Sequence, residues 1–138
     1  IVLMHNRAEA VYDDCWQGVK EDLEASIHIA RDAGVPDEHI WLDPGIGFAK
    51  TLAQNVEMMQ RLDQLVAMGY PVLLGTSRKS FIGKLLGVTV DERLEGSLAT
   101  VSFGVMKGCQ IVRVHDVKET VQTVRMIDFL TGKKRMEG

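Results

Sequence analysis

Short apolar runs alternate with amphipathic stretches along almost the whole chain. Four runs are apolar on both faces and end in turn residues, which predicts buried strands at Ile1–Met4, Ile40–Leu42, Pro71–Leu74 and Gln110–Val114. Between these runs, apolar residues recur at helical spacing, as Val19, Leu23 and Ile27 do. The same spacing predicts helices over about 14–34, 52–68, 81–86, 91–107 and 117–130.

The predicted order of elements is βαβαβαβα, which is typical of a parallel sheet covered by helices. The predicted strand ends Met4, Asp43, Thr76 and Arg113 are 39, 33 and 37 residues apart. A (β/α)₈ barrel of about 250 residues uses about 31 per unit, so four such units make half a barrel. We therefore predict an α/β fold, half of a TIM barrel, with an open parallel α/β sheet as the alternative.

The chain starts without a methionine, in a segment that already has the pattern of a strand. We therefore expect residues 1–138 to be a single domain or a fragment of a longer polypeptide. Half a barrel would leave two strand edges and one apolar sheet face uncovered. Such a piece needs a second half, a second copy or another packing arrangement to be stable.

Composition narrows the classes of partner. With 46% hydrophobic and 25% charged residues, the 138-residue chain has enough apolar material for a core. The net charge of −3 gives no positive field for nucleic acid, and no apolar run approaches the roughly 20 residues of a membrane span. Cys15 and Cys109 form no metal-binding motif, and we expect reduced thiols in a cytoplasmic protein.

Three predicted strands run directly into compact polar clusters. These clusters are Asp43–Phe48, Gly75–Ser80 and Arg113–Asp116. Ligands of parallel α/β proteins bind at the carboxyl ends of the strands, so the three clusters could meet at one pocket.

Each cluster also has a purely structural interpretation. Asp43 before Pro-Gly could simply start a turn, or it could accept two parallel N–H donors from a ligand beside the flat ring of Phe48. Lys79 lies in a polar loop before a helix, and it could donate to a heteroaromatic ring. Arg113 and His115 alternate on one side of a strand and suit a phosphate or pyrophosphate.

Other polar residues are expected to have structural roles. We predict that Asp116 caps the last helix and that Thr51 and Asn55 cap the helix after the first cluster. For His5, packing in the core or behind the site is expected.

Taken together, the motifs resemble those of one family. Leu-Met-His, Asp-Pro-Gly-Ile-Gly-Phe, Gly-Thr-Ser-Arg-Lys-Ser-Phe-Ile-Gly and Arg-Val-His-Asp-Val occur here in the order and spacing found in dihydropteroate synthases. The resemblance covers essentially all 138 residues and matches the C-terminal half of the bacterial enzyme, a pterin-binding (β/α)₈ barrel. It implies a transferase of folate biosynthesis that condenses 6-hydroxymethyl-7,8-dihydropterin pyrophosphate with p-aminobenzoate and releases pyrophosphate.

The resemblance also implies roles for individual residues. Asp43 would bind the guanidine-like edge of the pterin, and Lys79 would donate to its ring. Arg113 would stack on the pterin and hold the leaving pyrophosphate together with His115. The remaining implied substrate contacts are Ser80 at the p-aminobenzoate carboxylate, Phe48 beside it, and Met4 and Gly75 along the pterin slot.

The family's N-terminal half is missing from these residues, and with it an Asn that helps hold Mg²⁺ and pyrophosphate. We therefore expect Mg²⁺ as cofactor with its ligand outside this chain, and little or no turnover by the 138 residues alone. The resemblance further implies a homodimer and competition by sulfonamides. Two alternatives stay open: a pterin-binding module of a corrinoid-dependent methyltransferase, and a non-catalytic pterin-binding domain.

Overall fold

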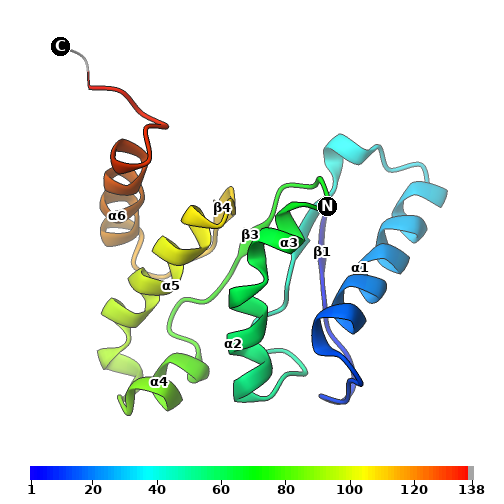
Figure 1. The fold of residues 1–138 in the computed structure, drawn as a ribbon, viewed down its shortest axis with the longest axis horizontal. Coiled ribbons are helices and arrows are strands. Elements are labelled where there is room, and N and C mark those ends of the chain that lie inside the picture. The colour runs from blue at the N-terminus through cyan, green and yellow to red at the C-terminus, as the bar shows by residue number, and fades with distance from the viewer. Residues whose placement is uncertain (137–138) are drawn as a thin grey trace.

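The computed structural model describes residues 1–136 and has the predicted alternation of parallel strands and helices. Figure 1 shows the helices side by side in chain order, from α1 to α6. The strands are β1 (Val2–Met4), β2 (Trp41–Asp43), β3 (Leu73–Leu74) and β4 (Ile111–Val112). The helices are α1 (Cys15–Asp32), α2 (Leu52–Gln60), α3 (Leu62–Val66), α4 (Ser80–Leu86), α5 (Leu94–Met106) and α6 (Val117–Leu130), with 3₁₀ turns at Asp37–His39 and Val90–Glu92.

The four strands are neighbours in the order in which they occur along the chain. β1 pairs with β2 in parallel, with Met4 opposite Asp43, and β3 pairs with β4 in the same sense. A parallel bridge between Leu42 and Val72 joins the two pairs. The order β1-β2-β3-β4 never reverses direction, whereas a doubly wound sheet requires a reversal.

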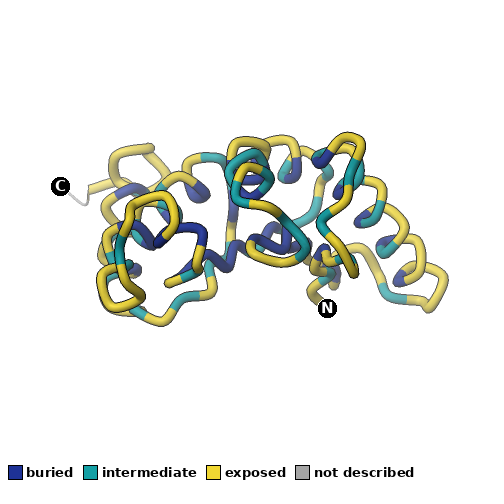
Figure 2. Tube along the Cα trace, turned by 90° about the horizontal axis from the view of Figure 1, so that it is seen from below, coloured by how far each residue is buried: buried dark blue, intermediate teal, exposed yellow. Residues whose placement is uncertain are grey.

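One face of the sheet is covered by helices and the other is exposed. Leu42, Val72 and Leu74 belong to the same buried cluster as Val19 and Leu23 of α1. The intervening side chains point the other way, and Val2, Met4 and Trp41 are 44%, 38% and 39% exposed. Figure 2 shows that buried positions recur between exposed ones along α1, as expected for a helix with one face on the core. Strand alternation places the apolar residues on both faces, but the helices cover only one.

Local signals in the sequence set most element ends. Asp14 caps α1 by accepting from the backbone N–H of Gln17 at 2.8 Å, and Gly34 ends the helix with a left-handed φ of 85°. Thr51 and Gln54 form a capping box at the start of α2.

Two predicted helices differ from the structure. The helix over 52–68 is divided into α2 and α3 at Arg61, whose backbone φ and ψ of −95° and 7° leave the helical range. The helix predicted from 91 begins only at Leu94, because Thr89 and Glu92 cap a separate 3₁₀ turn. Among residues 1–136, no helix has both the length and the apolar character to cross a membrane.

Candidate functional site

The ends of β3 and β4 form one small cavity. It has a volume of about 250 Å³ and is lined by Gly75, Ser77, Lys79, Arg113, Val114 and His115. Lys79, Arg113 and His115 therefore line one cavity although they come from two different loops, whereas Asp43 and Phe48 of the first cluster do not line it. Gly75 has no side chain to fill this space, and an added Cβ would lie 3.2 Å from Nη2 of Arg113.

His115 is oriented by a serine that the sequence analysis left without a role. The hydroxyl oxygen of Ser77 accepts from the backbone N–H of His115 at 3.1 Å and lies 2.8 Å from its Nδ1. The hydroxyl can donate its own proton to Nδ1, and a neutral imidazole that accepts there carries its proton on Nε2, the nitrogen opposite the serine.

Asp43 lies at the end of β2 and is almost completely buried. Its Oδ1 accepts from the backbone N–H of Gly45 at 2.8 Å, and among residues 1–136 no protein donor contacts Oδ2. Burial raises the pKa of this carboxyl above its ordinary value, against the opposing effects of the Gly45 hydrogen bond and the positive charges of Lys79 and Arg113. A buried carboxylate with one unused oxygen can accept from a ligand's N–H groups.

Lys79, in the second cluster, contacts the first. Its Nζ donates to the carbonyl of Ile46 and lies 5.0 Å from the centre of the Phe48 ring. Burial lowers the pKa of this lysine, Asp43 raises it and Arg113 lowers it further. Lys79 and Phe48 are thus neighbours, with Asp43 close enough to perturb the lysine electrostatically.

The remaining predicted site residues lie outside the lining of the small cavity. Met4 is paired with Asp43 across β1 and β2 and exposes its side chain on the uncovered face of the sheet. Ser80 is the exposed first residue of α4. The structure therefore places both near the strand ends but does not itself assign them a ligand.

Asp116 is the N-cap residue of α6, as predicted, but its side chain makes no capping hydrogen bond. Its carboxylate instead accepts from Nε and Nη2 of Arg78 at 3.1 and 2.6 Å, which lowers the pKa of the aspartate. The reason is tertiary: Arg78 has a left-handed φ of 56°, and its backbone is held by Ser97 and Arg93. The side chain is thereby directed toward the start of α6.

Asn55 does more than begin a helix. It is buried, and its Oδ1 accepts from the backbone N–H of Gly47 at 2.7 Å while its Nδ2 donates to the carbonyl of Thr51 at 3.0 Å. It thus fixes the loop after Asp43, and only the tertiary contact reveals this.

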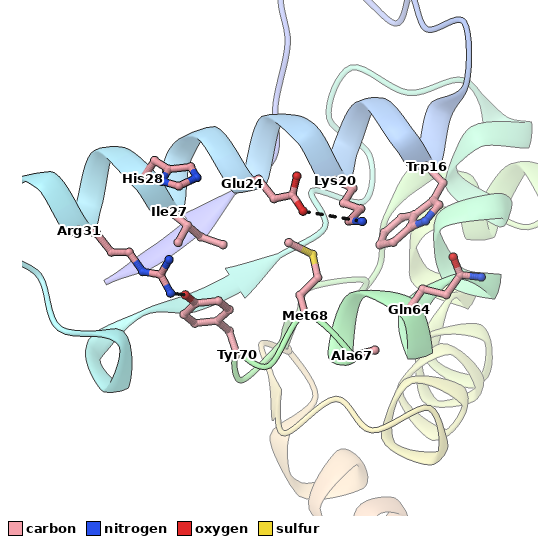
Figure 3. Close-up of a pocket in the computed structure, with 10 residues that line it drawn as sticks. All are labelled: Trp16, Lys20, Glu24, Ile27, His28, Arg31, Gln64, Ala67, Met68 and Tyr70. Carbon is pink, nitrogen blue, oxygen red and sulfur yellow. Dashed lines mark hydrogen bonds and ion pairs between the residues drawn. The ribbon is translucent and has the colours of Figure 1, made fainter.

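A larger groove of about 630 Å³ lies on the outer side, between α1 and α3 (Figure 3). Most of its charged groups have partners: Lys20 lies 3.7 Å from Glu24, and Arg31 bonds the hydroxyl of Tyr70 and, outside the groove, Asp37 at 2.7 Å. None of the predicted site residues reaches it. The groove is therefore a weaker candidate for chemistry than the strand ends.

Comparison with known proteins gives consistent matches. The family described as "Pterin binding enzyme" matches residues 1–115. The dihydropteroate synthase of Bacillus subtilis is 51% identical over 133 residues, covering 96% of this chain and 47% of the relative. The chain thus spans about half the length of the curated relatives it matches.

Solved structures superpose on the same region. The crystal structure of dihydropteroate synthase from Clostridium difficile in the presence of pteroic acid gives a TM-score of 0.91 at 48% identity, covering 94% of this chain and 49% of that one. The Yersinia pestis dihydropteroate synthase in complex with a sulfonamide drug gives 0.91 at 36% identity, covering 96% and 51%.

Proposed function

Because this chain belongs to the family of pterin-binding enzymes, we propose that it supplies one half of a dihydropteroate synthase. The complete enzyme would join 6-hydroxymethyl-7,8-dihydropterin pyrophosphate to p-aminobenzoate. The observation that carries the proposal is the single cavity in which Lys79, Arg113 and His115 meet beside Asp43. This reaction requires a hydrogen-bond donor, two groups that suit a pyrophosphate and a carboxylate that suits a pterin.

We propose that the four βα units are the C-terminal half of a (β/α)₈ barrel. Three features support this: the strand order, the helix layer on one face only, and the exposed side chains of Val2, Met4 and Trp41 on the other. In a closed barrel those side chains would fill the interior, where layers of apolar residues from alternate strands pack together. The outer strands β1 and β4 would pair with strands from the missing half.

In the proposed complex, Asp43 and Lys79 bind the pterin. Oδ2 of Asp43 accepts from the amino and ring N–H groups of the guanidine-like edge, because this oxygen has no protein donor among the described residues. Lys79 exchanges its contact with the Ile46 carbonyl for an acceptor on the pterin ring. Arg113 lies against the ring face from the end of β4.

The leaving group is held by Arg113 and His115. The bond between the pterin methylene carbon and the pyrophosphate oxygen breaks, and the electron pair leaves with pyrophosphate. The guanidinium and the Nε2–H of His115 donate to the anion as its charge develops. The amine of p-aminobenzoate then forms the new carbon–nitrogen bond and loses a proton, so the protein needs no covalent nucleophile.

The p-aminobenzoate subsite would lie between Phe48 and the start of α4. The Phe48 ring is 37% exposed and offers a flat apolar surface beside Lys79. The hydroxyl of Ser80 would meet the carboxylate, and Met4 and Gly75 would line the pterin slot. Sulfonamides would compete at the same place.

The proposed reaction uses Mg²⁺ as its cofactor. Residues 1–136 contain no group of three or more His, Cys, Asp and Glu side chains that could hold a metal ion. We keep the prediction that any ligand of Mg²⁺ comes from the other half of the barrel. The homodimer and the cytoplasmic location also stay predictions.

The proposal is tested by assembling the complete barrel, with an N-terminal half joined to residues 1–138, and measuring pyrophosphate release with the two substrates. We expect turnover that a sulfonamide inhibits competitively against p-aminobenzoate, and little or no turnover by the 138 residues alone. Binding of inorganic pyrophosphate, lost on Arg113→Met, would separate a synthase from a corrinoid-dependent methyltransferase module, whose methyl carrier presents no pyrophosphate. An assembled barrel that binds pterin but neither binds nor releases pyrophosphate would refute the synthase.

A further inference from the structure

The loop that carries Asp43 and Phe48 is tied together by one lysine, Lys50. Its Nζ lies 3.0 Å from the carbonyl of Gly45, 3.0 Å from the carbonyl of Phe48 and 2.9 Å from Nδ1 of His5. An ammonium group has three N–H donors and no acceptor, so these three contacts use all of them. Lys50 therefore closes the loop on itself and joins it to β1.

His5 continues this connection to α1. It is 2% exposed, and its Nε2 lies 2.9 Å from the carboxylate of Asp22. Because the ammonium can only donate and the carboxylate only accept, the imidazole is neutral with its proton on Nε2. Asp22 is in turn held by Nε of Arg7 at 2.6 Å.

The backbone of His5 is also part of the arrangement. Its N–H donates to the carbonyl of Asp43 at 3.0 Å, and its own carbonyl lies where a Cβ on Gly45 would be, only 1.9 Å away. The loop is thus held from both sides, by the hydrogen-bonded side chains of Asp22, His5 and Lys50 and by the His5 backbone. Neither Lys50 nor His5 lines the small cavity beside Arg113.

We propose that Lys50 and His5 are positioning residues that set the pterin-binding loop, residues 43–48, without touching the substrate. The inference rests on the proposed function for the identity of the ligand, but not for the order of the loop. Lys50 fixes the carbonyls on either side of Ile46, whose own carbonyl receives Lys79. A displaced loop would misplace Asp43 and Phe48 together, and a shift of about 1 Å at such groups can cost about 100-fold in rate.

Lys50 makes its three contacts although burial disfavours its charged ammonium group. Burial lowers the pKa of the lysine to about 8. The facing groups are Cys15 and Asp43, which raise it, and Lys79 and Arg7, which lower it. A half-buried lysine surrounded by two other cations is held there by its three acceptors rather than by an ion pair.

Two pairs of variants test this assignment in the complete barrel. Lys50→Met removes the three donors at similar length, and Lys20→Met, on the outer face of α1, is its control. His5→Asn keeps an acceptor near the position of Nδ1, whereas His5→Gln keeps a polar atom only near the position of Nε2. The probes are 6-hydroxymethylpterin and inorganic pyrophosphate, each measured by calorimetry, together with amide hydrogen exchange of the loops 43–49 and 75–80.

We expect Lys50→Met to lower the affinity for the pterin by about tenfold or more and to leave the affinity for pyrophosphate nearly unchanged. The substitution displaces the loop but not Arg113 and His115. Amide hydrogen exchange should become faster in residues 43–49 but not in residues 75–80. His5→Gln should behave like Lys50→Met, while His5→Asn should retain most of the wild-type order and Lys20→Met all of it.

Equal losses for both ligands, or equal exchange in both loops, would reduce Lys50 to a general stabiliser and overturn the proposal. Unchanged exchange in residues 43–49 would overturn it as well. If the wild-type barrel itself binds no pterin, the proposed function fails, and the exchange data still decide whether Lys50 and His5 hold the loop.

Discussion

Gly45 is the position where a single methyl group should do the most damage to the site. It has a left-handed φ of 68°, and an added Cβ would lie 1.9 Å from the backbone carbonyl oxygen of His5. A side chain in this conformation costs about 1–2 kcal/mol, and overpacking against backbone costs about 1–3 kcal/mol more. We therefore expect Gly45→Ala to lower the free energy of unfolding by about 2–5 kcal/mol.

Gly34 provides a matched control for this change. It has a similar φ of 85°, but no atom of residues 1–136 lies within 4 Å of its added Cβ. Gly34→Ala should therefore cost only the conformational part, about 1–2 kcal/mol. The difference between the two variants isolates the clash with His5.

The assay is urea unfolding of the complete barrel followed by circular dichroism, with pterin binding measured on the same samples. Gly45→Ala should also weaken the pterin, because the hydrogen bond from Gly45 to Asp43 is displaced, whereas Gly34→Ala should not. Equal destabilisation by the two substitutions would show that the His5 carbonyl moves away freely. The argument that this contact fixes the loop would then be refuted.

Three further changes probe the site and its support. Arg113→Met should lower kcat/KM of the complete barrel by about 10- to 150-fold, since charge-assisted hydrogen bonds contribute about 1.5–3 kcal/mol, and an unchanged value would exclude Arg113 from the leaving-group site. Ser77→Ala should cost about fivefold in kcat/KM with little change in the melting temperature, because it frees the His115 ring; the opposite pattern would make Ser77 purely structural. Burial and Lys50 lower the pKa of His5 below 6.5, so the unfolded chain binds a proton there that the folded chain does not. Wild-type stability should therefore fall as the pH drops below about 6.5, by up to about 1.4 kcal/mol per pH unit, and His5→Gln should flatten that slope in pH-dependent urea titrations.

The polar clusters at the strand ends could be located from the sequence because each cluster directly follows an apolar run. Asp43, Lys79, Arg113 and His115 each lie within a few residues of an apolar run, and parallel strands bring such ends to one edge. The sequence predicts that three clusters meet at one pocket. Lys79, Arg113 and His115, from the second and third clusters, line one cavity, whereas Asp43 of the first cluster lies outside its lining. Their roles toward substrate stay predictions.

The supporting residues could not be found in the same way. Ser77, Asn55 and Lys50 act through partners that are 38, 8 and 45 residues away, and the residues next to them in the sequence carry no sign of such a partner. The side chain of Asp116 has the right place for a cap, and only the position of Arg78 decides that it forms an ion pair instead. Long-range side-chain contacts depend on how distant segments pack against one another after folding. The local sequence pattern does not encode that packing.

The sequence by itself determined the alternation of strands and helices, the main helix caps and the polar groups at each strand end. These depend on side-chain periodicity and on backbone preferences within a few residues. The tertiary structure alone decided the strand order, the one-sided helix layer, the orientation of His115 and the support of the loop by His5 and Lys50. Each of these depends on groups that become neighbours only when distant segments pack, where burial fixes protonation and hydrogen-bond partners together.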